Sequence, residues 1–195
     1  MLEMIIVLTV FGALAILLFV IYIALIVMAV EALFVPLFDV PPKVPSQKKM
    51  RNVIMAEIHK NFPDAKTIID IGSGWGGMAM RAAREFPHAD AVGIELMPLP
   101  FCCATVSRCL LGPKNCRFAF GNAVRFIKDK KFDIAVCYSG PELMKAIEPH
   151  RDNFKVVLSI DFPLPNIAPS RTVTLHKDRM GQHVLYVYEA LGTRR

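Results

Sequence analysis

The sequence predicts a doubly wound α/β fold with a mostly parallel sheet of seven strands, preceded by one transmembrane helix. Three observations support this prediction. Residues 67–77 have the pattern of a buried strand that runs into a glycine-rich turn and the start of a helix. Strand and helix patterns then alternate almost to the C-terminus, which is typical of a parallel sheet covered on both faces. Residues 4–30 contain no charged side chain, as in a membrane-spanning helix.

The uncharged run is long enough to span a bilayer. Its 27 residues form roughly 40 Å of helix, against a hydrocarbon core of ~30 Å. A cleaved signal is less favoured, because no Lys or Arg precedes the run and Val30-Glu31-Ala32 is a poor cleavage site. We therefore expect a transmembrane anchor over residues 1–35, a linker over 36–45 and one further domain over 46–195. The linker is rich in proline, at Pro36, Pro41, Pro42 and Pro45.

Charge around the run predicts its orientation. The first 40 residues carry three acidic residues and no basic one, whereas Lys43, Lys48, Lys49 and Arg51 follow closely. Under the positive-inside rule, the chain is a single-pass membrane protein with its C-terminal domain in the cytoplasm, or on the matrix side if it is mitochondrial.

The C-terminal domain is basic and shows no metal or disulfide pattern. Residues 41–195 hold all 23 basic residues but only 14 of the 17 acidic ones, a net charge of +9. Anionic lipid headgroups, an acidic substrate or nucleic acid could each explain this charge. The basic residues are scattered and lack interleaved aromatic residues, so we expect no nucleic acid. The five cysteines form no C-x-x-C pair and the five histidines are dispersed, so we expect neither a disulfide framework nor a metal site.

The elements of the domain follow from the periodicity of apolar residues. A helix over residues 46–60 should begin at the N-cap Ser46 and pack Met50, Val53, Ile54 and Ile58 on the sheet. The last two strands are separated by a short turn and should form a hairpin. The expected strands are 67–71, 91–95, 116–120, 132–138, 155–160, 171–176 and 183–189, and the other expected helices are 76–86, 99–111 and 141–148.

The glycine-rich turn predicts a cofactor site. Gly72, Gly74 and Gly76 allow a tight turn and a close backbone approach to a ligand, and the following helix directs its free N–H groups at the same place. Asp70 narrows the choice of ligand. A carboxylate at this position suits an aminated cofactor such as S-adenosylmethionine (SAM) and would repel a pyrophosphate.

Two ligands remain open at this turn, SAM and a dinucleotide. Gly72, Gly74 and Gly77 also satisfy the dinucleotide pattern G-x-G-x-x-G. Either ligand needs an acid at the end of the second strand to bind the ribose hydroxyls, and Glu95 supplies it. The closing hairpin favours SAM, because nicotinamide dehydrogenases usually continue with a sixth parallel strand and a substrate-binding portion.

Across residues 46–190, the order of elements, with Asp70 before the glycines and Glu95 at the second strand, resembles the class I SAM-dependent methyltransferases. The resemblance implies that Asp70, Gly72, Ser73, Gly74 and Gly76 hold the methionine moiety and Glu95 the ribose. Asn122 stands where this family often has an Asp that faces the adenine amino group. An Asn side-chain oxygen can accept the same hydrogen bond.

Short motifs along nearly the whole chain are similar to those of the membrane-anchored protein-lysine methyltransferases, a family that acts on the ATP synthase c-subunit and the adenine nucleotide translocase and has prokaryotic relatives. The chain departs from the family pattern at Trp75, Gly77, Met97 and Ile167, which affects the target lysine more than the cofactor site. The motifs are Val44-Pro45-Ser46, Asp70-Ile71-Gly72-Ser73-Gly74, Gly93-Ile94-Glu95-Leu96 with Pro98, Ser107-Arg108, Gly140-Pro141 and Phe162-Pro163-Leu164-Pro165.

We expect the methyl acceptor to lie at the carboxyl ends of the fourth and fifth strands. Tyr138 and Glu142 are the predicted catalytic residues, because either could orient a lysine amine and help it lose a proton. Ser139, Pro141, Asp161 and Phe162 complete the expected lining.

The sequence therefore predicts a SAM-dependent methyltransferase that modifies a lysine of a membrane protein. Methylation of a lipid or quinone is an alternative that uses the same anchor and fold. A second alternative is a methyltransferase-like domain that binds a nucleotide or a partner without catalysis.

Overall fold

The computed structural model describes residues 2–37, 48–178 and 181–190 of the 195-residue chain. The chain divides into two compact units, Met1–Val40 and Pro41–Arg195. The predicted N-cap Ser46 and most of the predicted linker lie outside the described residues.

The first unit contains one helix, α1 (Leu2–Leu37). By length and composition it is the one helix among the described residues that could cross a membrane, and an 18-residue window within Glu3–Val30 has a mean hydropathy of 3.1. Pro36, predicted to open an extended linker, instead lies in the last turn of α1. The φ angle of proline suits a helix, and at a helix end the missing N–H removes only one hydrogen bond.

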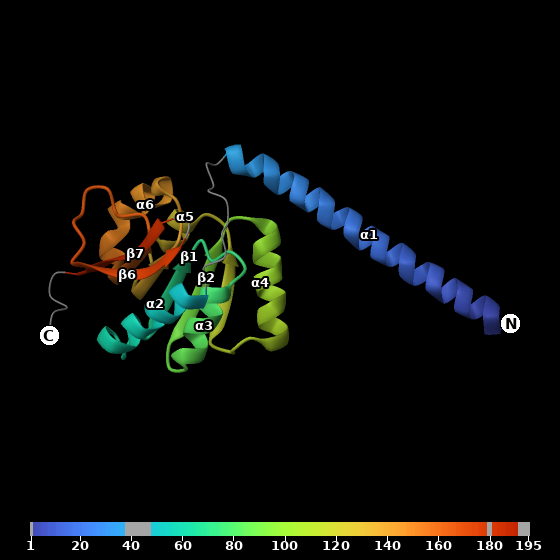
Figure 1. Ribbon diagram of the computed structural model, residues 1–195, viewed down its shortest axis with the longest axis horizontal. Coiled ribbons are helices and arrows are strands. Elements are labelled where there is room, and N and C mark those ends of the chain that lie inside the picture. The colour runs from blue at the N-terminus through green and yellow to red at the C-terminus, as the bar shows by residue number, and fades with distance from the viewer. Residues whose placement is uncertain (1, 38–47, 179–180, 191–195) are drawn as a thin grey trace. The chain divides into compact units, whose positions relative to one another are not determined.

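The second unit is built on the predicted seven-stranded sheet, with the strand order β3-β2-β1-β4-β5-β7-β6 (Figure 1). The first five strands are parallel, and β7 pairs antiparallel with both β5 and β6. Parallel pairing of β1 with β2 and β4 places the carboxyl ends of these strands at one edge of the sheet. The strands are β1 (Thr67–Ile71), β2 (Asp90–Glu95), β3 (Cys116–Phe120), β4 (Phe132–Cys137), β5 (Phe154–Ile160), β6 (Arg171–Asp178) and β7 (Gly181–Glu189).

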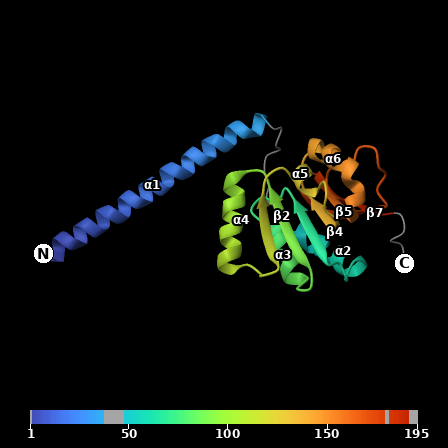
Figure 2. The same ribbon diagram turned by 180° about the vertical axis from the view of Figure 1, so that it is seen from behind.

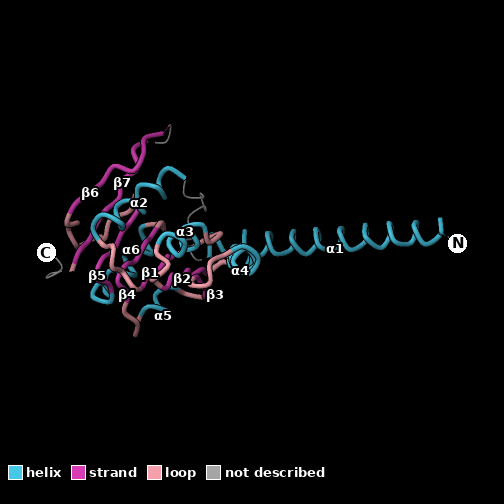
Figure 3. Tube along the Cα trace, turned by 90° about the horizontal axis from the view of Figure 1, so that it is seen from below, coloured by secondary structure: helices cyan, strands magenta, loops and turns pink. Residues whose placement is uncertain are grey.

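Helices cover both faces of the sheet, as Figures 2 and 3 show from two further sides. On one face, α2 and α3 pack on β1, β4 and β5, and on the other lie α5 and α6. The 3-10 helix η1 contacts α5, α6 and β5. α4 packs on β2 and β3 at the edge of the sheet. Their bounds are α2 (Lys48–Asn61), α3 (Gly77–Glu85), α4 (Pro98–Leu111), α5 (Ala123–Ile127), α6 (Pro141–Ile147) and η1 (Glu148–Asn153).

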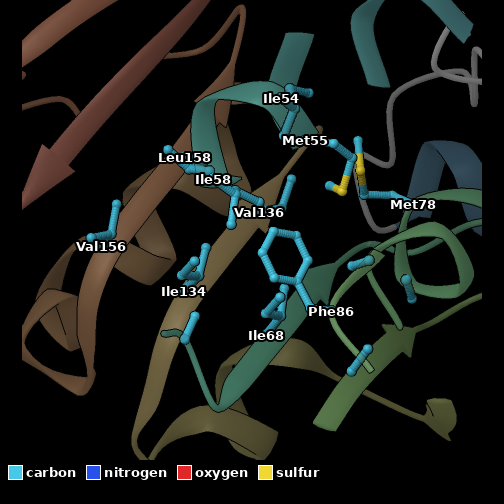
Figure 4. Close-up of a cluster of buried hydrophobic side chains, with 14 of the residues drawn as sticks. Ile54, Met55, Ile58, Ile68, Met78, Phe86, Ile134, Val136, Val156 and Leu158 are labelled. Atoms are coloured by element: carbon cyan, nitrogen blue, oxygen red, sulfur yellow. The ribbon is translucent and has the colours of Figure 1, made fainter. Parts of the chain in front are cut away.

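The core beneath α2 and α3 shows why these helices form. Ile54 and Ile58 of α2 repeat at helical spacing and meet Ile68, Val136 and Leu158 of the sheet (Figure 4). All five side chains are buried. The prediction that α2 packs on the sheet is therefore confirmed, although Val53 is only half-buried.

Several elements differ from the prediction. The sequence pattern does not predict α5 and η1, since both are too short to show an apolar period. The hairpin strands β6 and β7 extend further than expected, with Lys177 opposite Gln182 and Asp178 opposite Gly181. Pairing across a hairpin can continue through polar residues, which the alternation of apolar residues cannot reveal.

Candidate functional site

The glycine turn after β1 has the backbone that only glycine adopts readily. Gly72, Gly74 and Gly76 all have positive φ, at 73°, 54° and 79°. The N–H groups of Gly72 and Ser73 both donate to the Ile94 carbonyl at 3.0 Å, which fastens the turn to the end of β2.

At two of these glycines, Gly72 and Gly76, neighbouring side chains leave no room for a Cβ. A Cβ at Gly76 would lie 2.4 Å from a ring carbon of Phe118, and one at Gly72 would lie 2.5 Å from Ser139 Oγ. A Cβ at Gly74 would meet nothing within 4 Å. The turn therefore packs tightly at both ends and presents open space at Gly74, where a ligand can approach the backbone.

Glu95 connects the turn to the next helix. Glu95 is the last residue of β2 and is 2% exposed. Its carboxylate accepts hydrogen bonds from Gly74 N (2.7 Å) and Met97 N (2.8 Å). Each carboxylate oxygen has a second lone pair that could accept from a ribose hydroxyl. Glu95, the residue predicted to bind the ribose, thus lies beside the turn, and two backbone N–H groups fix the orientation of its carboxylate.

Asp70 lies beneath the turn, one residue before the end of β1, and is 5% exposed. Its Oδ2 accepts from Ala79 N of α3 at 3.2 Å. Burial raises the pKa of this carboxyl to about 7, and the nearby charge of Glu95 adds to the rise. A cationic ligand group beside Asp70 would offset this cost, as the ammonium of the methionine moiety could.

Ser73 adds an independent indication that this turn binds a polar ligand. Its side chain is 8% exposed, yet its Oγ has no hydrogen-bond partner. A buried hydroxyl without a partner is costly unless a ligand or water satisfies it. The open space at Gly74, the carboxyl groups of Asp70 and Glu95, and this hydroxyl fit a cofactor with cationic and hydroxyl groups.

Asn122 has a structural role that the sequence analysis did not foresee. Its Oδ1 accepts from Arg125 N at 3.1 Å and caps α5. It also lines a pocket of about 420 Å³, with Ile94, Phe120, Gly121, Arg125, Phe126, Asp129 and Lys130. The pocket begins at Ile94, the residue before Glu95, and passes Asn122.

The predicted acceptor residues lie at the same edge of the sheet. Tyr138 follows β4 directly and is half-buried, while Glu142 lies exposed in the first turn of α6. Ser139 Oγ donates to the Ile71 carbonyl over 3.5 Å, between the ends of β4 and β1. The structure thus brings Tyr138 and Ser139 next to the glycine turn.

The sequence analysis missed His183, which pairs with Asp161. Asp161 directly follows β5 and has a left-handed backbone, with φ of 64°. Its Oδ2 lies 2.7 Å from His183 Nδ1, and its Oδ1 accepts from Val184 N at 3.0 Å. Only the antiparallel pairing of β5 with β7 brings the two residues together, so no local pattern could have revealed the pair.

His183 lies on the same face of the sheet as Tyr138. Successive residues of a strand alternate between faces, and Leu185, two residues after His183, packs in the same core as Val136, two residues before Tyr138. Among the described residues, no group of three or more His, Cys, Asp or Glu could hold a metal ion.

Comparisons with known proteins agree with this geometry. No protein-family model matches the chain. A release factor glutamine methyltransferase from Geobacter sulfurreducens is 28% identical over 127 residues, which are 64% of this chain and 44% of the relative. The chain thus spans less than half the length of that curated relative.

Solved structures show the same fold. An RNA methyltransferase from Salinibacter ruber, in complex with S-adenosyl-L-homocysteine, has a TM-score of 0.61 and 25% identity, covering 76% of this chain and 95% of that one. The N-terminal domain of EvdMO1 with S-adenosyl-L-homocysteine bound has a TM-score of 0.59 and 15% identity, covering 75% and 82%. The domain after α1 therefore has the class I SAM-dependent methyltransferase fold.

Proposed function

We propose that this chain is a SAM-dependent methyltransferase. The observation that carries the proposal is the glycine turn, which joins the buried Asp70 and Glu95 and leaves open space at Gly74. The two structural relatives described above, at 25% and 15% identity, contain the demethylated cofactor. SAM supplies an activated methyl group, so the protein has to position the acceptor and remove its proton.

Cofactor binding can be tested separately from catalysis. The full-length chain in detergent should bind SAM and S-adenosylhomocysteine in calorimetry and bind NAD far more weakly. Glu95→Ala should weaken binding roughly tenfold or more, because hydrogen bonds to a charged group contribute ~1.5–3 kcal/mol. Tight binding of NAD without binding of SAM would contradict the proposal.

The proposed substrate is a lysine of a membrane protein. The named relatives act on a release factor and on RNA, so the fold alone does not select the acceptor. The selection proposed here rests on α1, which is long and apolar enough to hold the domain at a bilayer, and on the motifs shared with the membrane-anchored lysine methyltransferases.

In this proposal, Tyr138 and Glu142 orient the lysine amine, and the Asp161–His183 pair takes up its proton. The amine nitrogen then forms a bond to the methyl carbon as the carbon–sulfur bond of SAM breaks. The products are methyl-lysine and neutral S-adenosylhomocysteine, and His183 releases the proton to water.

The decisive assay is transfer of labelled methyl groups from SAM into membranes, followed by acid hydrolysis. Label in methyl-lysine supports the proposal. Label confined to the organic-solvent phase would instead identify a lipid or quinone acceptor, and label released by ribonuclease would identify RNA. An Asp70→Ala variant should lose both cofactor binding and transfer, which controls for contaminating enzymes. Cofactor binding without any transfer would favour the non-catalytic alternative.

A further inference from the structure

The helix α4 is apolar on its outer side as well as its inner side. Ala104 packs inward and is fully buried, yet Val106 and Leu110 are 56% and 74% exposed. Cys102 and Cys109 are also exposed, and these four residues follow the i, i+4, i+7, i+8 spacing of one helical stripe. We call this stripe of Cys102, Val106, Cys109 and Leu110 the α4 face. Surface helices normally present polar residues to water, so an outward apolar stripe indicates a binding surface.

The charge around the α4 face indicates what it binds. Residues 96–128 contain five basic residues and no acidic one. This segment comprises α4, the edge strand β3 and α5. Four of the five, Lys114, Arg117, Arg125 and Lys128, are exposed. Figure 2 shows α4 beside β2 at this edge of the domain. Lys114 follows the end of α4, and Arg117 lies on β3, against which α4 packs. An apolar stripe beside basic side chains is complementary to the surface of an anionic bilayer.

We infer that the α4 face docks the domain on a bilayer that contains anionic lipids. This inference rests on the proposed membrane anchor, which holds the domain close to a lipid surface. The exposed Phe120 lies at the carboxyl end of β3 and its ring contacts Phe101 of α4, with centroids 5.4 Å apart. The apolar surface therefore continues to the edge of the sheet where the site lies. Docking through it presents the site to acceptors at the height of the lipid headgroups.

Cys109 provides a probe on this face, since Cys116 and Cys137 are buried. The full-length chain with Cys102→Ser and Cys103→Ser would carry an environment-sensitive fluorophore at Cys109. It would be reconstituted in vesicles of phosphatidylcholine with or without phosphatidylglycerol. The matched control carries the fluorophore at Thr172→Cys on β6, an exposed position at the opposite edge of the sheet, with Cys109→Ser added.

Docking predicts that iodide in the water quenches the Cys109 probe several-fold less in anionic vesicles than in detergent, while lipid-borne quenchers reach it. The probe at position 172 should remain accessible to iodide. Val106→Asp with Leu110→Asp, or high salt, should return the Cys109 probe to the accessibility seen in detergent, with SAM binding unchanged.

Iodide accessibility at Cys109 equal to that at position 172 would overturn the inference. So would protection that appears equally in detergent, or that grows with protein concentration through contact between copies. Carbonate extraction tests the anchor separately. A chain that is extracted by carbonate lacks the anchor, whereas a chain that resists extraction but leaves the Cys109 probe accessible to iodide is anchored without docking.

Discussion

At the scale of single residues, the proposed cofactor site contains two carboxyl groups in different environments, those of Asp70 and Glu95. Glu95 accepts hydrogen bonds from two backbone N–H groups, whereas Asp70 accepts one from Ala79 N of α3. Burial of Asp70 therefore dominates and raises its pKa to about 7. A cofactor that brings a positive charge to Asp70 therefore binds most tightly when this carboxyl is ionised.

The raised pKa of Asp70 predicts a pH dependence with a defined sign. The folded state binds the Asp70 proton more tightly than the unfolded state does, so this group's contribution to stability is present at low pH and is lost as pH rises from about 4 to about 7. A cationic ligand lowers the pKa again, so SAM affinity should increase with pH up to about 7 and then level off.

Asp70→Asn isolates this effect. The variant should be more stable than the natural protein at pH 8 and should bind SAM weakly with little pH dependence between 6 and 8. Thermal unfolding and calorimetry across this range measure both properties. Equal SAM affinity of the natural protein at pH 6 and pH 8 would contradict the assigned role of Asp70.

A second prediction at this scale concerns proton removal. His183→Gln should lower methyl transfer by ~10²- to 10⁴-fold, and Tyr138→Phe or Glu142→Gln by ~10- to 10⁴-fold, with SAM affinity little changed. Raising the pH should partly restore the His183→Gln variant, because the acceptor amine then loses its proton to water. A variant that is merely misfolded would lose SAM binding as well and would gain nothing at high pH. Unchanged transfer in His183→Gln would remove this residue from the mechanism.

At the scale of elements, the turn between β1 and α3 is closely packed at Gly76 and open at Gly74, where we propose that the cofactor binds. Gly76 has a left-handed backbone and lies against Phe118, while Gly74 has a left-handed backbone and open space. The same substitution should therefore have different consequences at the two positions.

Gly76→Ala should lower the free energy of unfolding by ~2–4 kcal/mol, since it adds a clash with an aromatic ring to the backbone strain. Gly74→Ala should cost only ~1–2 kcal/mol of stability, from the backbone alone. It should nevertheless weaken SAM binding by roughly tenfold or more, because its Cβ enters the open space. Denaturant unfolding and calorimetry on both variants test this. Equal loss of stability with unchanged binding in Gly74→Ala would place the cofactor elsewhere.

The elements also show which parts of the structure the sequence could predict. The strands at residues 67–71 and 116–120 match β1 and β3, because apolar runs beside glycine or polar residues leave a clear local signal. α5 left no such signal, since a helix from Ala123 to Ile127 depends on the cap made by Asn122. The Asp161–His183 pair could not be predicted either, because it arises from the pairing of β5 with β7.

At the scale of the whole molecule, the chain combines an apolar helix with a basic methyltransferase-fold domain. The segment Glu3–Val30 is apolar, whereas every Lys and Arg follows Val40. This asymmetry should fix both the attachment of the chain to the membrane and its orientation, since basic residues that follow a span are retained on the cytoplasmic side.

The full-length chain should therefore resist carbonate extraction, and residues after Lys43 should be accessible to protease added from the cytoplasmic side. Replacing Lys43, Lys48, Lys49 and Arg51 by Gln should lower the fraction of chains with the domain on the cytoplasmic side without releasing the chain from the membrane. The apolar helix drives insertion, whereas the basic residues set the orientation. Protease digestion of sealed vesicles, with and without detergent, distinguishes the orientations, and mass spectrometry of the N-terminus detects cleavage. A carbonate-soluble product that begins near Ala32 would show that the helix is a removed signal, and the acceptor would then no longer be expected in a membrane.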